Sequence, residues 1–415
     1  MNTNTYNLSV IPGFNDLVKS NNNNSTILKL NKIECRSNNS VYRVVRYDKN
    51  FLCHDLISSY GLCRSVIINS ANNVVGFAPP KSIAADVFIQ KYPEHIIDNF
   101  IVAEEFVEGT MINVFFDPSI GITGGWEIST RNTVGATSSF YKSPHAKTFR
   151  QMFMEAATEN KLDISKLDAQ FCYSFVLQHP ENRIVVPFSK PQLYLVGVYG
   201  IVNDVNEVKV ISYDSSNYKT FFNELGTSVK FPEIYCFDKY SELIEKYGSM
   251  NTSYDIVGVI IHNKTTGERT KIRNPVYEQV RNLRGNQPKL QYQYLCLRKE
   301  GKVKDFLKYY PENKKEFSAF RDQVHLFTNT LFSNYVSCYI KKEKPVFEFS
   351  EQYRTHMFNI HKLYMNDLKE KRMFVTNTVV QKYVNELHPS LLMYCLNFQM
   401  RKRNIDTIVA DNSTV

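Results

Sequence analysis

The feature that most constrains this chain of 415 residues is a change of hydrophobic period near residue 285. Before it, apolar residues come in short β-branched and aromatic runs that turn signals separate. After Gly285-Asn286-Gln287-Pro288 they recur at helical spacing. The length also favours two or three domains. We therefore predict a strand-rich first domain over residues 25–285 and a helical second domain over residues 289–403.

Strands and helices do not alternate regularly in the first domain. Strand-like runs cover 41–47, 65–69, 100–107, 111–116, 192–202, 208–213 and 255–262. Helices are predicted at 143–159, where Ser143 can cap and Pro144 suits the first turn, and at 239–247. This pattern favours an α+β domain over a doubly wound sheet. The Asn/Ser-rich residues 1–24 predict a mobile N-terminal arm with room for one short strand, and residues 404–415 a tail.

Two long apolar stripes define the second domain. One runs from Phe317 to Cys338 and the other from Tyr353 to Leu368. Each fits one face of an amphipathic helix, so their aromatic residues are expected to be core residues. Thr376 or Asn377 can cap a third helix, and Pro389 can start a fourth.

The charge is concentrated in the helical part. Residues 286–415 hold 21 Lys and Arg against 13 Asp and Glu, and residues 1–285 hold 29 against 28. The last third thus carries a net +8 of the total +9. A basic module beside a neutral one is typical of a protein with a polyanionic partner, although lysines on solvated helix faces are also common.

Other patterns bear on the cellular environment. None of the eight cysteines forms a Cys-x-x-Cys pair, which favours buried free thiols over a zinc or disulfide framework. The N-terminus shows no secretory signal, and no apolar run reaches the length of a membrane span. We expect an intracellular, cytoplasmic protein without a membrane partner.

His356 and His361 are five residues apart, which is not the spacing of a helical metal pair, and no metal site is predicted.

Several segments of the first domain occur in an order that carries a resemblance. They are Cys63-Arg64-Ser65-Val66, Val74-Val75-Gly76-Phe77-Ala78-Pro79-Pro80-Lys81, Glu105-Phe106-Val107-Glu108-Gly109-Thr110, Ser129-Thr130-Arg131, Pro180-Glu181-Asn182-Arg183-Ile184-Val185, Val257-Gly258-Val259-Ile260 and Thr270-Lys271-Ile272-Arg273. This series resembles the nucleotidyltransferase domain of bacteriophage-type RNA ligases. The helical part looks similar to accessory domains of RNA-ligase-like proteins from large DNA viruses. The resemblance implies an RNA-ligase-like fold of mixed antiparallel sheets.

The resemblance also implies that the catalytic residues have been lost. In the family, a lysine before x-Asp-Gly attacks the α-phosphate of ATP, and Phe106 stands at that position. Two carboxylates that help to hold metal and nucleotide fall on Val176 and Val257. A one-residue slip of the alignment does not restore the nucleophile, because no lysine occurs from Tyr92 through Tyr141. Glu104 and Glu105, beside this position, would repel a triphosphate.

The cationic positions of the family are retained. We therefore expect nucleotide or RNA binding at Arg64, Glu108, Gly109, Arg131, Asn182, Arg183, Lys271 and Arg273. The favoured hypothesis is a catalytically inactive protein that binds RNA or a nucleotide and needs no cofactor. One alternative is an active RNA ligase with an atypical nucleophile, which would use ATP and Mg²⁺. Another is a structural protein that has lost its ligand; its protein partners cannot be named from the sequence.

Overall fold

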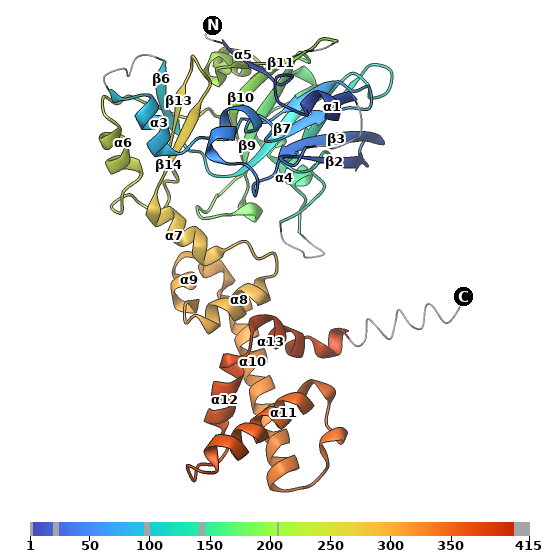
Figure 1. Ribbon diagram of the computed structural model, residues 1–415, viewed down its shortest axis with the longest axis vertical. Coiled ribbons are helices and arrows are strands. Elements are labelled where there is room, and N and C mark those ends of the chain that lie inside the picture. The colour runs from blue at the N-terminus through green and yellow to red at the C-terminus, as the bar shows by residue number, and fades with distance from the viewer. Residues whose placement is uncertain (1–2, 20–24, 95–99, 141–145, 206, 402–415) are drawn as a thin grey trace, which may run out of the picture. The chain divides into compact units, whose positions relative to one another are not determined.

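The computed structural model describes residues 3–19, 25–94, 100–140, 146–205 and 207–401 (Figure 1). The chain divides into two compact units, residues 1–281 and 282–415. The division falls inside helix α7 (Pro275–Arg284), a few residues before the boundary that the sequence suggested. Gly285, with φ +62°, follows the last residue of this helix, so the glycine marks a helix end.

Three antiparallel sheets build the first unit. The six-stranded sheet has the order β1 (Thr3–Asn7), β11 (Val208–Tyr213), β10 (Gln192–Asn203), β9 (Phe171–Gln178), β7 (Thr110–Asp117) and β8 (Gly125–Ser129). A second sheet has the order β12 (Ile234–Tyr235), β6 (Ile101–Glu105), β13 (Gly258–Asn263) and β14 (Arg269–Arg273). The third joins β2 (Leu28–Cys35), β3 (Ser40–Tyr47), β4 (Val66–Ile68) and β5 (Val74–Phe77). The predicted α+β class is thus confirmed.

The six-stranded sheet has a core on each face. Towards the β2–β5 sheet, Phe115, Tyr199 and Val210 pack with residues of that sheet. On the other face, Phe153 of α4 (Phe149–Glu159) and Phe222 of α5 (Lys219–Glu224) cover Phe175. Helix α4 begins later than expected, because Thr148 and Gln151 form a capping box. The proposed cap Ser143 lies outside the described residues.

The N-terminal residues correct one expectation. Residues 3–19 are not a mobile arm: β1 pairs with β11 along its whole length, and α1 (Phe14–Lys19) follows. Leu8, Phe14 and Leu17 are at most 1% exposed and belong to the core between two sheets. Burial of these side chains fixes a segment whose polar composition suggested mobility.

In the second sheet, alternate side chains point to opposite faces. Ala103, Val259, Ile261 and Ile272 pack under helices α3 (Ala85–Lys91) and α6 (Tyr240–Tyr247). The alternate positions Glu104, His262, Arg269, Lys271 and Arg273 therefore lie on the other face. A row of charged residues is thus left on the face that the helices do not cover.

The second unit is helical throughout its described part. Its helices are α8 (Leu290–Lys299), α9 (Val303–Tyr309), α10 (Lys314–Tyr335), α11 (Glu351–Leu363), α12 (Asn377–Glu386) and α13 (Pro389–Leu396). Both predicted stripes lie on helices, α10 and α11, and each helix ends in a π-helical turn, Val336–Ile340 and Tyr364–Leu368. Thr376 caps α12, and Pro389 opens α13. No helix in the described part of the chain has the length and apolarity needed to cross a membrane.

A cationic candidate site around Phe106

The Phe106 side chain, just after β6, lies against two cations from strand β14. Lys271 Nζ is 4.6 Å from the centroid of the ring, and the Arg273 guanidinium carbon is 5.5 Å from it. Cations at these distances from an aromatic face are attracted to its electron density. The structure therefore brings together three positions that the sequence analysis placed at one site.

The Lys271 amine is surrounded by the positive charges of several arginines. Burial, together with the positive charges of Arg269, Arg64, Arg273 and Arg281, lowers its pKa to about 6. Among the described residues it forms no ion pair, whereas Arg273 is bound by Glu278 at 2.5 Å. A buried amine among cations is costly to charge unless an anion joins it. This arrangement is suited to bind a negatively charged ligand.

The cationic group extends to Arg64 and Arg131. Burial and the neighbouring Arg269 lower the pKa of Arg64 to about 10, and Arg131 contributes a smaller repulsion. The Arg131 guanidinium carbon lies 5.2 Å from the centroid of the Tyr47 ring. We call Arg64, Arg131, Arg269, Lys271 and Arg273 the cationic cluster.

Unsatisfied polar atoms accompany this cluster. In the described part of the chain, Arg131 Nε, Ser65 Oγ and Ser129 Oγ are buried and have no hydrogen-bond partner. Ser65 follows Arg64 directly, and Ser129 ends the strand that leads to Arg131. Buried polar groups usually have partners. The unpaired Arg131 Nε, which belongs to the cluster itself, therefore supports a polar ligand at this place.

Glu108, Gly109 and Asn182 have a different role from the cationic cluster. They lie where residues 108–110, which lead into β7, meet residues 182–186, which follow β9. The backbone N–H groups of Val185 and Val186 donate to Glu108 Oε1 at 2.7 and 3.1 Å. Asn182 Nδ2 donates to Thr110 Oγ1 at 2.8 Å. Burial raises the pKa of Glu108, and these backbone donors oppose that shift. We call this set of contacts the clasp.

Gly109 of the clasp tolerates no side chain. Its φ is +148°, and a Cβ would lie 2.5 Å from the carbonyl oxygen of Leu177 and 2.7 Å from Cγ1 of Val176. Val176 is buried against this glycine on β9. Arg183 Nε donates to Val185 O at 2.9 Å, and the Arg183 charge also acts on Glu108. Arg183 is thus bound within the clasp and lies outside the cationic cluster.

A cavity of about 310 Å³ connects the clasp with Phe106. Phe106, Glu108 and Val257 line it, together with the acidic residues Glu105 and Asp255. Burial raises the pKa of Glu105, so its negative charge is disfavoured. The three positions at which the family's catalytic residues are replaced therefore do not line the same cavity. Phe106 and Val257 line it, and Val176 packs behind Gly109.

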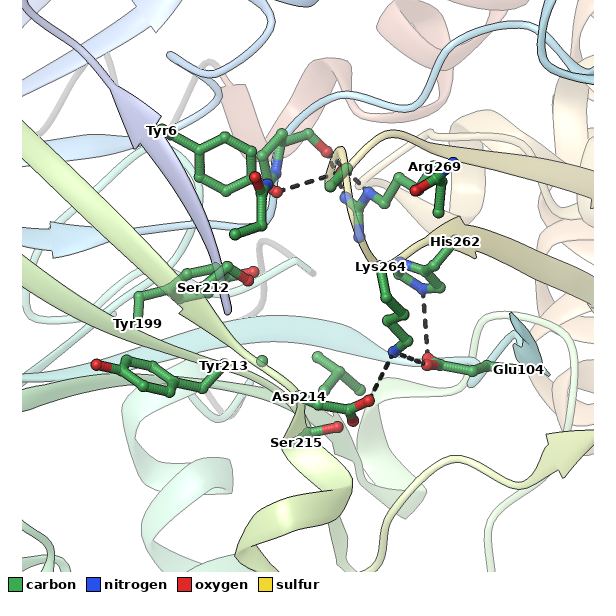
Figure 2. A pocket seen from close by; sticks show the side chains of 16 residues that line it. Tyr6, Glu104, Tyr199, Ser212, Tyr213, Asp214, Ser215, His262, Lys264 and Arg269 are labelled. Atoms are coloured by element: carbon green, nitrogen blue, oxygen red, sulfur yellow. Dashed lines mark hydrogen bonds and ion pairs between the residues drawn. The ribbon is translucent and has the colours of Figure 1, made fainter. Parts of the chain in front are cut away.

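Further along the same sheet face, charged side chains form a paired network (Figure 2). Lys264 Nζ lies 2.7 Å from Glu104 and 3.1 Å from Asp214, and His262 lies 3.3 Å from Glu104. Burial alone would raise the pKa of Glu104, but His262 and Lys264 outweigh it and hold this pKa far below its usual range. Glu104 is therefore ionised, and it shares the single positive charge of Lys264 with Asp214. The cavity that this network borders measures only about 70 Å³.

The sequence analysis missed Arg269. Its guanidinium is buried and donates to the carbonyl oxygen of Pro80 at 3.0 Å through Nε. Arg269, Lys271 and Arg273 alternate along one strand, so the period of two could have placed all three on one face. Lys81 was missed too; burial and repulsion from Arg131 and Arg64 lower its pKa, which places it near the cluster.

Comparisons with known proteins agree with the resemblance seen in the motifs. No family model matches the chain. It is 24% identical over 291 residues to an RNA ligase of Rhodothermus phage RM378, covering 62% of this chain and 64% of that protein. It is 23% identical over 316 residues to an immediate-early protein ICP-46 homolog of invertebrate iridescent virus 6, covering 69% and 65%. The chain is thus similar to RNA-ligase-like proteins of viral type.

This RNA-ligase-like chain matches less than two thirds of the length of either relative. The activity of a whole relative is therefore not carried over to it. Among solved structures, an archaeal ATP-dependent RNA ligase aligns with a TM-score of 0.41 at 12% identity, covering 86% of this chain and 93% of that one. A Naegleria gruberi RNA ligase variant with ATP and Mn aligns with a TM-score of 0.33 at 11% identity, covering 49% and 58%.

The residues present do not fit a catalytic metal ion. Val176 and Val257 offer no oxygen ligand from their side chains, and the Glu108 carboxylate is already bound by two backbone N–H groups. Within the described ranges, no group of three or more His, Cys, Asp or Glu side chains could hold a metal. We therefore derive no metal-dependent step for this RNA-ligase-like protein.

Proposed function

We propose that this RNA-ligase-like protein binds RNA without ligating it and holds a phosphate group of the RNA in the cationic cluster. The observation that carries the proposal is the position of Lys271 and Arg273 at the ring of Phe106. A phosphate between these cations would relieve the repulsion that lowers the pKa of Lys271. Phe106 supplies no nucleophile, so the RNA or nucleotide is bound and released unchanged.

The test compares RNA with a 5′-monophosphate to the same RNA with a 5′-hydroxyl. Lys271→Ala and Arg131→Ala should each weaken binding of the phosphorylated RNA by about tenfold, since a charged hydrogen bond contributes roughly 1.5–3 kcal/mol. Lys32→Ala, which removes an exposed lysine of β2, is the matched control and should change binding little. Equal affinities of the natural protein and all three variants for both RNAs would contradict phosphate binding in the cationic cluster. No RNA binding at all would favour a structural protein that has lost its ligand.

Covalent chemistry is tested with ATP labelled at the α-phosphate. Incubation with Mg²⁺ or Mn²⁺ should leave no label on the denatured protein, because Phe106 cannot form a phosphoramide bond. Phe106→Lys should not restore ligation by itself, because Val176 and Val257 still provide no carboxylate for a metal. A label that survives denaturation would contradict the hypothesis that the protein is catalytically inactive.

One observation favours a second candidate, an adenylyltransferase with a displaced nucleophile. The Lys271 amine lies beside Phe106, and with its pKa lowered to about 6 much of it is uncharged at neutral pH. An uncharged buried amine is a competent nucleophile. In that case the protein would carry a label from ATP, and Lys271→Met would abolish it.

A further inference from the structure

A polar cavity of about 210 Å³ lies in the helical unit, away from every motif that the sequence analysis used. Arg298 of α8 lines it together with His325, Thr328 and Asn329 of α10 and Gln381 and Asn385 of α12. Helix α10 packs against both α8 and α12 (Figure 1). Residues 381 and 385 are four apart, as are 325 and 329, so each pair lies on one helix face.

The lining of this cavity is polar throughout. The six lining side chains include no carboxylate and no hydrocarbon side chain. An apolar peptide anchor or a lipid chain finds no matching surface there, and a metal cation finds no negative ligand. Three carboxamides, an imidazole and a guanidinium offer donors and acceptors together with a positive charge.

Two hydrogen bonds tie the helices around this cavity. Asn377 Nδ2, at the start of α12, donates to Asn329 Oδ1 at 3.2 Å. Lys299 Nζ, at the end of α8, donates to the carbonyl oxygen of Glu386 at 3.4 Å. The Oδ1 atom of Asn377 is buried and finds no partner among the described residues. The lining is therefore held at both ends of α12, and an unsatisfied acceptor lies next to it.

The size of the cavity limits what it can hold. Pockets that enclose a drug-sized ligand measure roughly 300–1,000 Å³. A cavity of about 210 Å³ is below that range, and it suits a smaller group such as a single nucleobase. Asn and Gln carboxamides recognise base edges through paired donor and acceptor atoms, and Arg contacts the adjoining phosphate.

We propose that this cavity receives one unpaired base of a bound RNA and gives the helical unit a base preference. The proposal rests on the proposed function, because it assumes that RNA is the ligand. It adds that the basic helical unit reads a base, through Asn329, Gln381 and Asn385, in addition to attracting phosphates. Arg298 contacts the phosphate next to the inserted base.

The experiment uses the full chain and single-stranded ten-nucleotide RNAs of A, C or U. The natural protein should prefer one base by about fivefold or more, the lower end of the discrimination that a bidentate contact provides. Gln381→Ala combined with Asn385→Ala should reduce this preference to within about twofold and leave the salt dependence unchanged, because no charge is removed. Arg298→Gln should weaken all three RNAs alike.

The matched control removes the same two residue types elsewhere on the helical unit. Asn366→Ala combined with Gln399→Ala changes two exposed carboxamides and should keep the base preference. Thermal unfolding of each variant shows whether the fold is intact. An identical base preference in the cavity variant, or none in the natural protein, overturns the cavity proposal and leaves RNA binding standing. If no RNA binds at all, the proposed function fails as well.

Discussion

Lys271 shows at the scale of one residue how a site can lower the stability of its own fold. The amine is buried among Arg269, Arg64, Arg273 and Arg281, which lowers its pKa from 10.5 to about 6. Between these two values the unfolded chain binds a proton that the folded chain does not bind. The free energy of unfolding therefore rises as the pH increases from about 6 towards 10.5. Residues kept at such a cost are common at functional sites.

Replacing Lys271 with methionine should remove this pH dependence. Lys271→Met should be more stable than the natural protein at neutral pH, and the difference should shrink as the pH approaches 10.5. The slope removed is at most about 1.4 kcal/mol per pH unit, the value for one proton. Denaturant unfolding at a series of pH values measures it, with Lys32→Met as the control for loss of an exposed lysine. Parallel curves for the natural protein and Lys271→Met would show that the amine is charged in the fold.

The order of the motifs predicted which residues would lie near Phe106, because each motif keeps its place on a strand or at its end. Lys271 and Arg273, which the motif order assigned to the same site, lie beside this ring, and their role in binding stays a prediction. The division between the cationic cluster and the clasp could not be predicted. It depends on Glu108 meeting the N–H groups of Val185 and Val186, which are 77 and 78 residues away. Such long-range pairing leaves no local pattern in the sequence.

The N-terminal segment shows the same limit at the scale of an element. Strands rich in β-branched residues, such as β3 and β13, were predictable from composition. The strand Thr-Asn-Thr-Tyr-Asn carries a mixed signal, because Thr and Tyr favour strands and Asn does not, and pairing with the edge of β11 decides its structure. Local propensity is a weak guide where tertiary pairing decides the structure.

A core substitution tests whether this segment belongs to the fold. Phe14→Ala should lower the free energy of unfolding by about 3–5 kcal/mol, the usual cost of truncating a buried phenylalanine. Phe14 is fully buried between two sheets, whereas Val10 is 71% exposed. Val10→Ala should stay within about 0.5 kcal/mol of the natural protein. If both changes are equally mild in denaturant unfolding, the segment is a mobile arm after all.

At the scale of the whole molecule, the proposed function divides the recognition of RNA between the two units. The first unit offers a few basic groups that are fixed by burial and by neighbouring strands, such as Arg64 and Lys271. The helical part carries most of the net charge, on residues that are largely exposed. Fixed cations suit one defined phosphate, and exposed lysines suit many interchangeable phosphates. The contribution of the helical part to the affinity for RNA can therefore be measured separately from the contribution of the first unit to the position of the RNA.

This division predicts how binding should depend on salt. Each phosphate contact on a single strand contributes about 0.7 to the slope of log affinity against log salt concentration. A protein that ends at residue 284, after helix α7, should lose most of this slope, because residues 286–415 hold 21 Lys and Arg against 13 acidic residues. Lys271→Ala in the full chain should lower the slope by only about 0.7, the contribution of one phosphate contact. Filter binding at several salt concentrations measures both, and circular dichroism checks that the shortened protein keeps its strands. A shortened protein with an unchanged slope would place the RNA on the first unit alone.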